Sequence, residues 1–359
     1  MNYTIERFLS DNATIKHIPI NAILELTPLC NLNCDMCYVR LDKTAVNKMG
    51  GLRSVDEWIT WAEEMQQAGT LFTLLTGGEP LLYPEFQKLY LHLKKLGMII
   101  TINTNGTLID EAWADFFAVN RPRRINITLY GKDSNTYDKL CHCSKGFQQT
   151  IRAIQLLKSK NIDVKINGSI TPSNMQDSFQ LLRIAERLKV PIKIDTYMYP
   201  ASREKSHCFN EAARLNPSLA AKIRTLLMKQ QNEDFTDRAK DFVTKAENTA
   251  PGIKQETQST CRAGRSSFAI NWQGYMRPCI LVTKPEVPVF SNGFISAWNQ
   301  ITEKTAQIYL SSKCNTCTLR NVCQTCAACA FLETGKYNGT PDYMCQYTQQ
   351  TLKFLKEYL

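Results

Sequence analysis

The chain carries the stretch CNLNCDMCY at residues 30–38, in which Cys30, Cys34 and Cys37 follow a CxxxCxxC spacing. Four-iron clusters are normally held by four cysteine thiolates. A loop with three, and no fourth cysteine adjacent in the sequence, would leave one iron open to a ligand from outside the protein. A zinc site or three buried thiols are the alternatives, but a structural zinc usually has four ligands and no histidine lies beside this loop.

A second motif, Thr76-Gly77-Gly78-Glu79-Pro80, follows an apolar stretch that is typical of a strand. Two glycines let the backbone approach a small zwitterion without a clash at Cβ, and their amide groups can bind it. Taken alone, such a run is also typical of a turn before a helix.

The two motifs together resemble the radical S-adenosylmethionine (SAM) enzymes. The resemblance implies that Cys30, Cys34 and Cys37 hold a [4Fe-4S] cluster whose open iron binds SAM, and that an electron from the cluster cleaves SAM to a 5′-deoxyadenosyl radical. It also implies SAM contacts from a set of residues near the strand ends: Tyr38, Gly77, Gly78, Glu79, Pro80, Asn105, Thr128 and Asp195. For the strand-end residues Asn105, Thr128 and Asp195, simple capping is the alternative.

Cys141 stands where many relatives carry an arginine that pairs with the SAM carboxylate. A thiol at this rim could donate a hydrogen atom to a substrate radical, which makes Cys141 a candidate catalytic residue. The alternative is a short loop beside a helix, in which Cys141, His142 and Cys143 have no chemical role.

Short apolar strands alternate with amphipathic helices from residue 20 to about 200, which predicts a parallel sheet covered by helices. Ser54–Ala68 is one predicted helix, with Ser54 and Glu57 in a capping-box pattern, and another is predicted to begin near Ser173. The predicted strands are Ile20–Leu26, Leu71–Leu75, Met98–Asn103, Arg124–Leu129, Val164–Ile170 and Ile192–Tyr197. Six βα units match the α/β fold of the family, a partial (β/α)6 TIM-like barrel, with the three-cysteine loop at the carboxyl ends of the strands.

Cysteines become dense after residue 260, and their pattern resembles the SPASM domain, which carries auxiliary iron–sulfur clusters. The cysteines concerned are Cys261, Cys279, Cys314, Cys317, Cys323, Cys326, Cys329 and Cys345. A zinc site of four thiolates from the CxxC pairs 314/317 and 323/326 is the alternative.

The resemblance implies a distal cluster on Cys314, Cys317, Cys323 and Cys345, and a proximal cluster on Cys261, Cys279 and Cys326. The fourth proximal ligand is open: it is Cys329, a substrate thiol, or absent because the chain carries one cluster fewer. One or two auxiliary [4Fe-4S] clusters are therefore expected.

The 359 residues divide by pattern into an N-terminal extension (1–19), the barrel (20–202), a polar helical bridge (203–258) and the cysteine-rich domain (259–359). The chain has no signal peptide and no apolar run that could cross a bilayer, so we expect a cytoplasmic protein, in which 14 cysteines serve as ligands rather than disulfides. The formal charge of +10 suggests an acidic partner, but no basic run indicates nucleic acid.

Most SPASM members act on peptides or proteins, so the resemblance implies maturation of a ribosomal peptide by a thioether or carbon–carbon crosslink. An electron donor such as flavodoxin or ferredoxin is implied. Because only about twenty residues precede the first strand, a separate leader-recognition protein or a leaderless route is expected. The alternatives are protein oxidation of the anaerobic sulfatase-maturing type, disfavoured because Ile280 replaces an aspartate base, and a non-catalytic iron–sulfur electron carrier.

Overall fold

The computed structural model describes residues 4–200, 213–248 and 261–359. A sheet of nine strands in these residues has the order β6-β5-β4-β3-β2-β1-β7-β8-β9. The strands are β1 (Asn21–Glu25), β2 (Phe72–Thr76), β3 (Ile99–Thr104), β4 (Arg124–Thr128), β5 (Val164–Ser169), β6 (Ile192–Asp195), β7 (Ser267–Ile270), β8 (Tyr275–Arg277) and β9 (Val287–Pro288).

Strands β1 to β6 are parallel, and each pairs with its neighbour in the sequence. Their order and position confirm the predicted α/β architecture with a partial (β/α)6 barrel, because all six predicted strands are present and each of their ends lies within two residues of the predicted one. All six carboxyl ends therefore lie at the same rim, where the loops that follow them can form one site.

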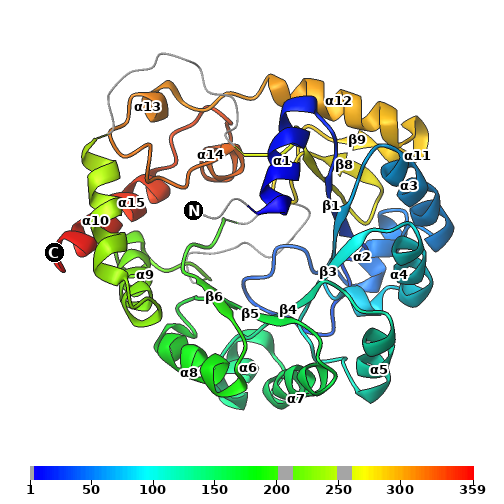
Figure 1. Cartoon of the computed structure of the whole chain (residues 1–359), viewed down its shortest axis with the longest axis horizontal. Coiled ribbons are helices and arrows are strands. Elements are labelled where there is room, and N and C mark those ends of the chain that lie inside the picture. The colour runs from blue at the N-terminus through cyan, green and yellow to red at the C-terminus, as the bar shows by residue number, and fades with distance from the viewer. Residues whose placement is uncertain (1–3, 201–212, 249–260) are drawn as a thin grey trace.

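Helices surround the sheet and form the outer wall of the molecule (Figure 1). Around the barrel they are α1 (Ile5–Lys16), α2 (Lys43–Lys48), α3 (Val55–Gln67), η1 (Pro80–Leu82), α4 (Phe86–Lys95), α5 (Glu111–Val119), α6 (Ser134–Cys141), α7 (Gly146–Ser159), η2 (Met175–Asp177) and α8 (Ser178–Leu188). Further along the chain they are α9 (Pro217–Gln231), α10 (Phe235–Glu247), α11 (Val289–Asn292), α12 (Phe294–Ala306), α13 (Ser312–Asn315), α14 (Ala327–Thr334) and α15 (Asp342–Lys356). No helix in the described ranges combines the length and the apolar composition that crossing a membrane requires.

The local signals in the sequence explain one predicted helix and not another. Helix α3 begins after Ser54, and the predicted capping box with Glu57 is present. The helix predicted to begin near Ser173 is present as α8, but it begins five residues later, at Ser178, after the single 3-10 turn η2. The Asn174 side chain accepts a hydrogen bond from Thr171 N at 2.7 Å and donates to Tyr130 O at 2.7 Å, which holds residues 171–174 as a turn before η2.

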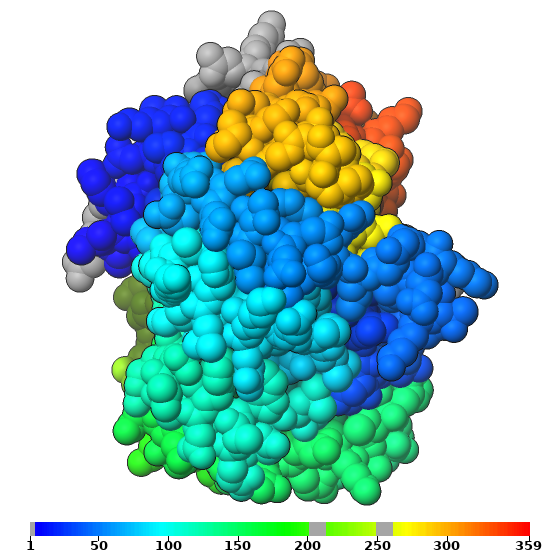
Figure 2. Space-filling view, turned by 90° about the vertical axis from the view of Figure 1, so that its right-hand side faces the viewer, coloured from blue at the N-terminus to red at the C-terminus, as the bar shows by residue number. Residues whose placement is uncertain are grey.

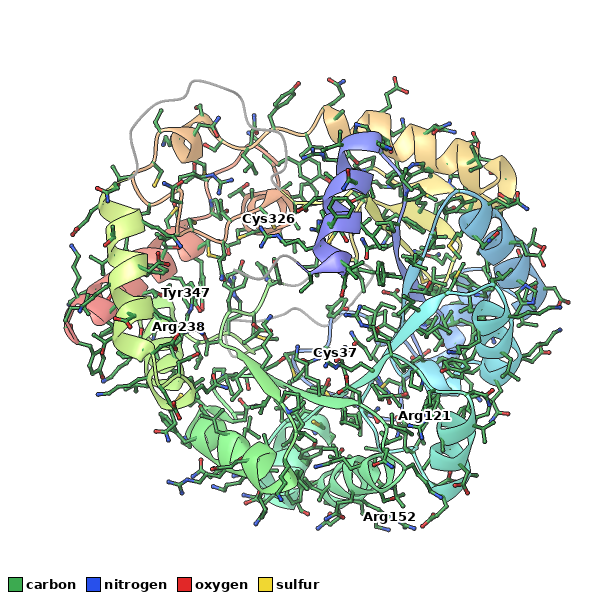
Figure 3. All side chains as sticks on the ribbon, viewed as in Figure 1. Cys37, Arg121, Arg152, Arg238, Cys326 and Tyr347 are labelled. Atoms are coloured by element: carbon green, nitrogen blue, oxygen red, sulfur yellow. The ribbon has the colours of Figure 1, made fainter. Side chains whose placement is uncertain are left out.

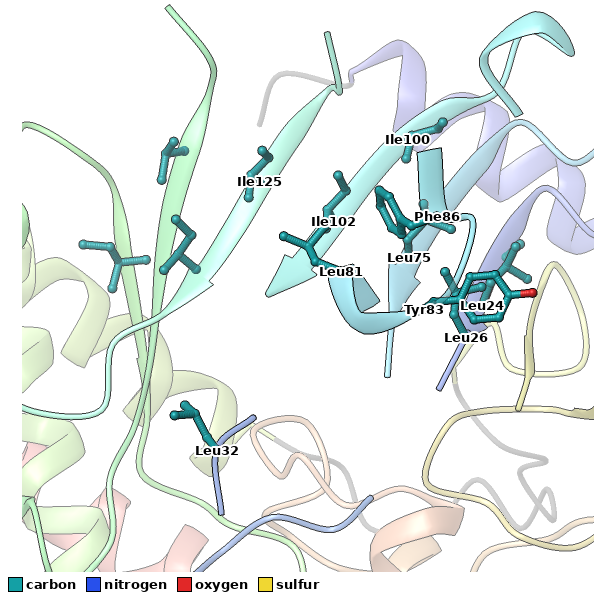
Figure 4. Packing of buried hydrophobic residues seen from close by; sticks show 14 of the residues in the cluster. Leu24, Leu26, Leu32, Leu75, Leu81, Tyr83, Phe86, Ile100, Ile102 and Ile125 are labelled. Carbon is teal, nitrogen blue, oxygen red and sulfur yellow. The ribbon is translucent and has the colours of Figure 1, made fainter. Parts of the chain in front are cut away.

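The main core lies between the sheet and the helices. Apolar side chains on successive strands, among them Leu24, Leu75, Ile102 and Ile125, are fully buried there (Figure 4). Burial of this kind contributes about 1.5–3 kcal/mol for each large side chain.

The cysteine-rich part of the chain continues the barrel sheet. Strand β7 pairs in parallel with β1, on the side of β1 that does not face β2, and β8 and β9 follow as antiparallel strands. Helix α12 packs against α3, and Figure 2 shows the two in contact on one continuous surface. The buried side chains of Ile270, Met344 and Tyr347 belong to the same core as the barrel strands.

Helix α9 begins after Asn216, as predicted, and packs along α15 at the end of the chain. The predicted boundaries at 202/203 and 258/259, and Cys208, lie outside the described residues.

Candidate functional site

The three-cysteine loop follows β1 and packs closely on the glycine motif that follows β2. Gly78 N donates to Thr27 O at 2.7 Å, and Glu79 N donates to Leu29 O at 2.8 Å. A Cβ atom at Gly78 would lie 2.4 Å from Leu29 O. Only glycine fits here, so the GGEP motif holds the segment that leads into Cys30.

A cavity of about 220 Å³ opens at the carboxyl ends of the strands, and Cys30, Cys34 and Cys37 line it together. Five other predicted residues line it as well: Tyr38, Gly77, Gly78, Asn105 and Thr128. Figure 3 shows Cys37 on the inner side of the ring of helices. The structure thus brings both sequence motifs to one site.

Glu79 and Pro80 are buried but do not line this cavity. The Glu79 carboxylate accepts hydrogen bonds from Thr104 Oγ1 and from Asn105 N, both at 2.8 Å. Burial raises the pKa of Glu79 to about 7, although these hydrogen bonds favour the ionised form. The placement does not support the predicted contact with SAM, because Glu79 lies beneath the cavity and connects β2 to the loop after β3.

Asp195 also lies away from the cavity. Its side chain is 54% exposed and pairs with Lys193 at 3.0 Å, so the placement gives it no contact with a ligand in the cavity. Met198 and Ser169 line the cavity instead. The sequence reasoning missed both, although Ser169, as a polar residue at the end of β5, carried the same signal as Thr128.

Cys141 lies at the end of α6, where its side chain is fully buried and does not line the cavity. It forms a side-chain hydrogen bond with Cys34. A hydrogen-atom donor must reach the substrate radical, so this placement argues against the predicted donor role. It also brings a fourth thiol, 104 positions from Cys37, to the three-cysteine loop.

Two thiols of the three-cysteine loop, those of Cys30 and Cys37, accept backbone hydrogen bonds and are partly buried, as ligands of an iron–sulfur cluster are expected to be. Leu32 N donates to Cys30 Sγ at 3.4 Å, and Arg40 N donates to Cys37 Sγ at 3.3 Å. Burial raises the pKa of the Cys30 thiol to about 12, so a thiolate here requires a cationic partner such as iron.

Among the residues that the structure describes, no group of three or more His, Cys, Asp or Glu side chains lies close enough to share one metal ion.

Four of the C-terminal cysteines gather at a second site. Cys314, Cys317, Cys323 and Cys345 line a cavity of about 70 Å³ together with Arg320. Leu319 N donates to Cys317 Sγ at 3.4 Å, and Thr348 Oγ1 donates to Cys323 Sγ at 3.5 Å. This is the set that the resemblance assigned to the distal cluster.

A third group contains Cys261, Cys279 and Cys326. Burial, with the nearby thiols of Cys261 and Cys326, raises the pKa of Cys279 to about 11. Figure 3 places Cys326 in the C-terminal part, on the inner side of the ring of helices. These three are the cysteines that the resemblance assigned to the proximal cluster.

Cys329 is held by a different set of partners. Its fully buried Sγ lies 3.0 Å from the Tyr197 hydroxyl and 3.8 Å from Glu333 Oε1. Tyr197 donates to the same Glu333 oxygen at 2.8 Å, and Arg214 pairs with it at 3.1 Å. The hydrogen-bonding capacity of Cys329 is thus used within this network.

The partial barrel and the three-cysteine cavity at its rim are the arrangement expected of a radical SAM domain. Residues 24–183 match the model of the radical SAM superfamily, so this part of the chain is a radical SAM domain. Its cysteine-rich C-terminal part is consistent with the SPASM type.

Relatives and solved structures span most of the chain at low identity. The AdoMet-dependent heme synthase of Methanosarcina barkeri is 22% identical, over 90% of this chain and 95% of that protein. The antilisterial bacteriocin subtilosin biosynthesis protein AlbA of Bacillus subtilis is 24% identical, over 74% of this chain and 56% of AlbA. The structure of Streptococcus suis SuiB bound to precursor peptide SuiA superposes with a TM-score of 0.70 at 17% identity, over 95% of this chain and 80% of SuiB.

Proposed function

We propose that this enzyme matures a ribosomal peptide, forming a thioether or carbon–carbon crosslink after hydrogen abstraction. One observation carries the proposal: the segment after β6 contacts the SAM-side cavity and the C-terminal cysteines at once. Met198 lines the cavity, whereas Tyr197 contacts Cys329 and the Tyr199 hydroxyl bonds to Cys326. A substrate at Met198 would therefore lie between the radical source and the proximal cysteines.

The residues of this chain have separate tasks in the proposed reaction. Cys30, Cys34 and Cys37 would hold the cluster, and Gly77, Gly78 and Thr128 would orient SAM. When bound, the cluster and SAM supply the 5′-deoxyadenosyl radical that removes a hydrogen atom from the substrate.

The C-terminal cysteines would hold one or two auxiliary clusters. They are Cys261, Cys279 and Cys326 for the proximal cluster, and Cys314, Cys317, Cys323 and Cys345 for the distal one. An external electron donor of the flavodoxin or ferredoxin class, a separate leader-recognition protein and a cytoplasmic location belong to the same proposal.

Two comparisons support a peptide substrate. AlbA is a bacteriocin biosynthesis protein, and SuiB shares the fold while bound to a precursor peptide. The lining of the cavity at the described residues carries no charged side chain, which suits the neutral backbone and side chains of a peptide.

Formation of heme from a tetrapyrrole is a second candidate. It is favoured by the heme synthase of M. barkeri, which this chain matches over 95% of that protein. Against it, tetrapyrrole carboxylates call for arginine or lysine partners, and neither lines the cavity in the part of the chain that the structure describes.

The test uses anaerobically reconstituted enzyme with dithionite and SAM, and a variant with Cys30, Cys34 and Cys37 changed to Ala as control. Short cysteine- or aromatic-rich peptides, including those encoded next to the gene, form one arm, and iron coproporphyrin forms the other. We expect substrate-dependent 5′-deoxyadenosine and a peptide lighter by two hydrogens, both lost in the control. Turnover of the tetrapyrrole alone would establish the second candidate and refute the first.

A further inference from the structure

The three cysteines of the loop differ in what contacts their sulfur. Backbone amides donate to Cys30 Sγ and Cys37 Sγ, from Leu32 N and Arg40 N respectively. Backbone donors of this sort are fixed by the fold of the loop itself. The thiol of Cys34 instead shares a side-chain hydrogen bond with the thiol of Cys141.

Helix α6 fixes Cys141 in this position. Asn33 N donates to Cys141 O at 3.1 Å, and Asp35 N donates to Leu140 O at 3.0 Å, so the backbone on both sides of Cys34 is bonded to the last turn of the helix. Cys141 is 0% exposed and Cys34 is 6% exposed. The Cys141 thiol therefore faces Cys34 and has no path into the cavity.

A second side-chain donor serves Cys30. Asn105 Nδ2 lies 3.7 Å from Cys30 Sγ and donates to Asn31 Oδ1 at 2.9 Å. Thr107 fixes the orientation of this amide, because its backbone N and its hydroxyl both donate to Asn105 Oδ1, at 2.8 and 2.7 Å. The nitrogen, not the oxygen, must then face the thiol.

We propose that Cys141 and Asn105 are positioning residues that raise the reduction potential of the cluster held by Cys30, Cys34 and Cys37, and that Cys141 acts as a hydrogen-bond donor and not as a fourth ligand. Reduction adds negative charge to the cluster, and hydrogen bonds to the cysteine sulfurs stabilise that charge. The proposal rests on the cluster part of the proposed function and is independent of the substrate.

The experiment is a redox titration of the reconstituted full-length enzyme without SAM, followed by electron paramagnetic resonance, with iron determined for each variant. The resonance signal of the cluster held by Cys30, Cys34 and Cys37 is identified as the one that is absent when all three cysteines are changed to Ala. Cys141→Ala removes the donor, Cys141→Ser restores an O–H donor, and Asn105→Asp replaces the amide nitrogen by oxygen. Cys143→Ala is the matched control, which removes a nearby, partly buried thiol two residues further along the chain.

We expect all four variants to keep the iron content of the wild type. At a fixed potential, the ratio of reduced to oxidised cluster falls about fivefold in Cys141→Ala, given the modest net value of one hydrogen bond. The ratio falls in Asn105→Asp as well, recovers in Cys141→Ser and is unchanged in Cys143→Ala.

Two results would overturn the proposal. An unchanged midpoint potential in Cys141→Ala would remove the donor role, and loss of iron in that variant would make Cys141 a ligand. Retention of all iron and of every signal in the triple variant would instead refute the cluster assignment, and with it the proposed function.

Discussion

Single residues at the site show how tightly the two sequence motifs depend on one another. Gly78 has no room for a side chain, because a Cβ atom there would lie 2.4 Å from Leu29 O and 2.7 Å from Pro28 O. Both oxygens belong to the rigid segment that leads into Cys30. The glycine is therefore required by the position of the cysteine loop and not only by the ligand.

Substitution of Gly78 by Ala should displace this segment. We expect at least half of the iron of the first cluster to be lost on reconstitution, with a matching loss of 5′-deoxyadenosine, because the loop cannot hold three thiols in register. Gly97→Ala is the control: its φ of +80° makes alanine strained, but no atom lies within 4 Å of the added Cβ. Its cost is about 1 kcal/mol of stability, with full iron content. Equal iron in the two variants would contradict the steric argument.

Glu79 should make stability depend on pH. Its pKa rises from about 4.5 in the unfolded chain to about 7 in the fold because of burial, so the native state binds the proton more tightly. The stabilisation is complete below pH 4.5 and is lost as the pH rises to about 7, by about 3 kcal/mol in all.

Unfolding by denaturant under anaerobic conditions tests this at pH 5.5 and pH 8. The free energy of unfolding of the wild type relative to Glu79→Gln should be larger at pH 5.5 by about 2 kcal/mol, because glutamine does not titrate. A difference that is the same at both pH values would show that Glu79 keeps one protonation state across this range.

The residues that line the site were predictable only where a motif fixed the backbone. CxxxCxxC and GGEP gave the cysteines and both glycines, all of which line the cavity. The direction of a single side chain at a strand end was not predictable, because it depends on where the strand stops: β6 ends at Asp195, which faces away, and Met198 reaches the cavity three residues later. Cys141 needed the fold, since nothing in the sequence places it beside Cys34.

At the scale of elements, hydrophobic periodicity and capping patterns predicted the strands and α3. They did not predict which distant strands pair. Strand β7 has only four residues, Ser267–Ile270, and pairs with β1 more than 240 positions earlier. No local pattern encodes that partner. The same holds for α14, which contacts Tyr197 after β6 through the thiol of Cys329 and one buried carboxylate.

That carboxylate, Glu333, should be a main stabilising contact between α14 and the barrel. Its side chain is 7% exposed and binds Arg214, which is 14% exposed, as well as the Tyr197 hydroxyl. Glu333→Ala leaves a buried guanidinium without its anion, and we expect a loss of about 3 kcal/mol in the free energy of unfolding.

Glu333→Gln keeps an acceptor for Tyr197 and should cost less. Glu247→Ala is the matched control, because its pair with Lys356 connects α10 to α15 but is about half exposed. It should cost under about 1 kcal/mol. Similar losses in the free energy of unfolding for Glu333→Ala and Glu247→Ala would show that the buried ion pair stabilises the fold no more than the exposed one.

At the scale of the whole molecule, the barrel and the cysteine-rich part share a sheet and a core, so they should unfold together. Phe268 on β7 is fully buried and packs against Phe294 at 5.1 Å and Trp298 at 5.8 Å between ring centroids. It belongs to the same core as Leu24 of β1. Because β7 covers the edge of β1, loss of one strand exposes the other.

Hydrogen exchange at increasing denaturant concentration can show whether the barrel and the cysteine-rich part unfold together or separately. Peptides that cover β1 and β7 should lose protection at the same denaturant concentration, and Phe268→Ala should lower that concentration equally for both, through a cost of about 3–5 kcal/mol. The matched control is Phe290→Ala on α11, where the side chain is 42% exposed and the cost is correspondingly smaller. Earlier exchange of β7, with β1 still protected, would show two independent units, and the auxiliary cysteines could then detach from the barrel without unfolding it.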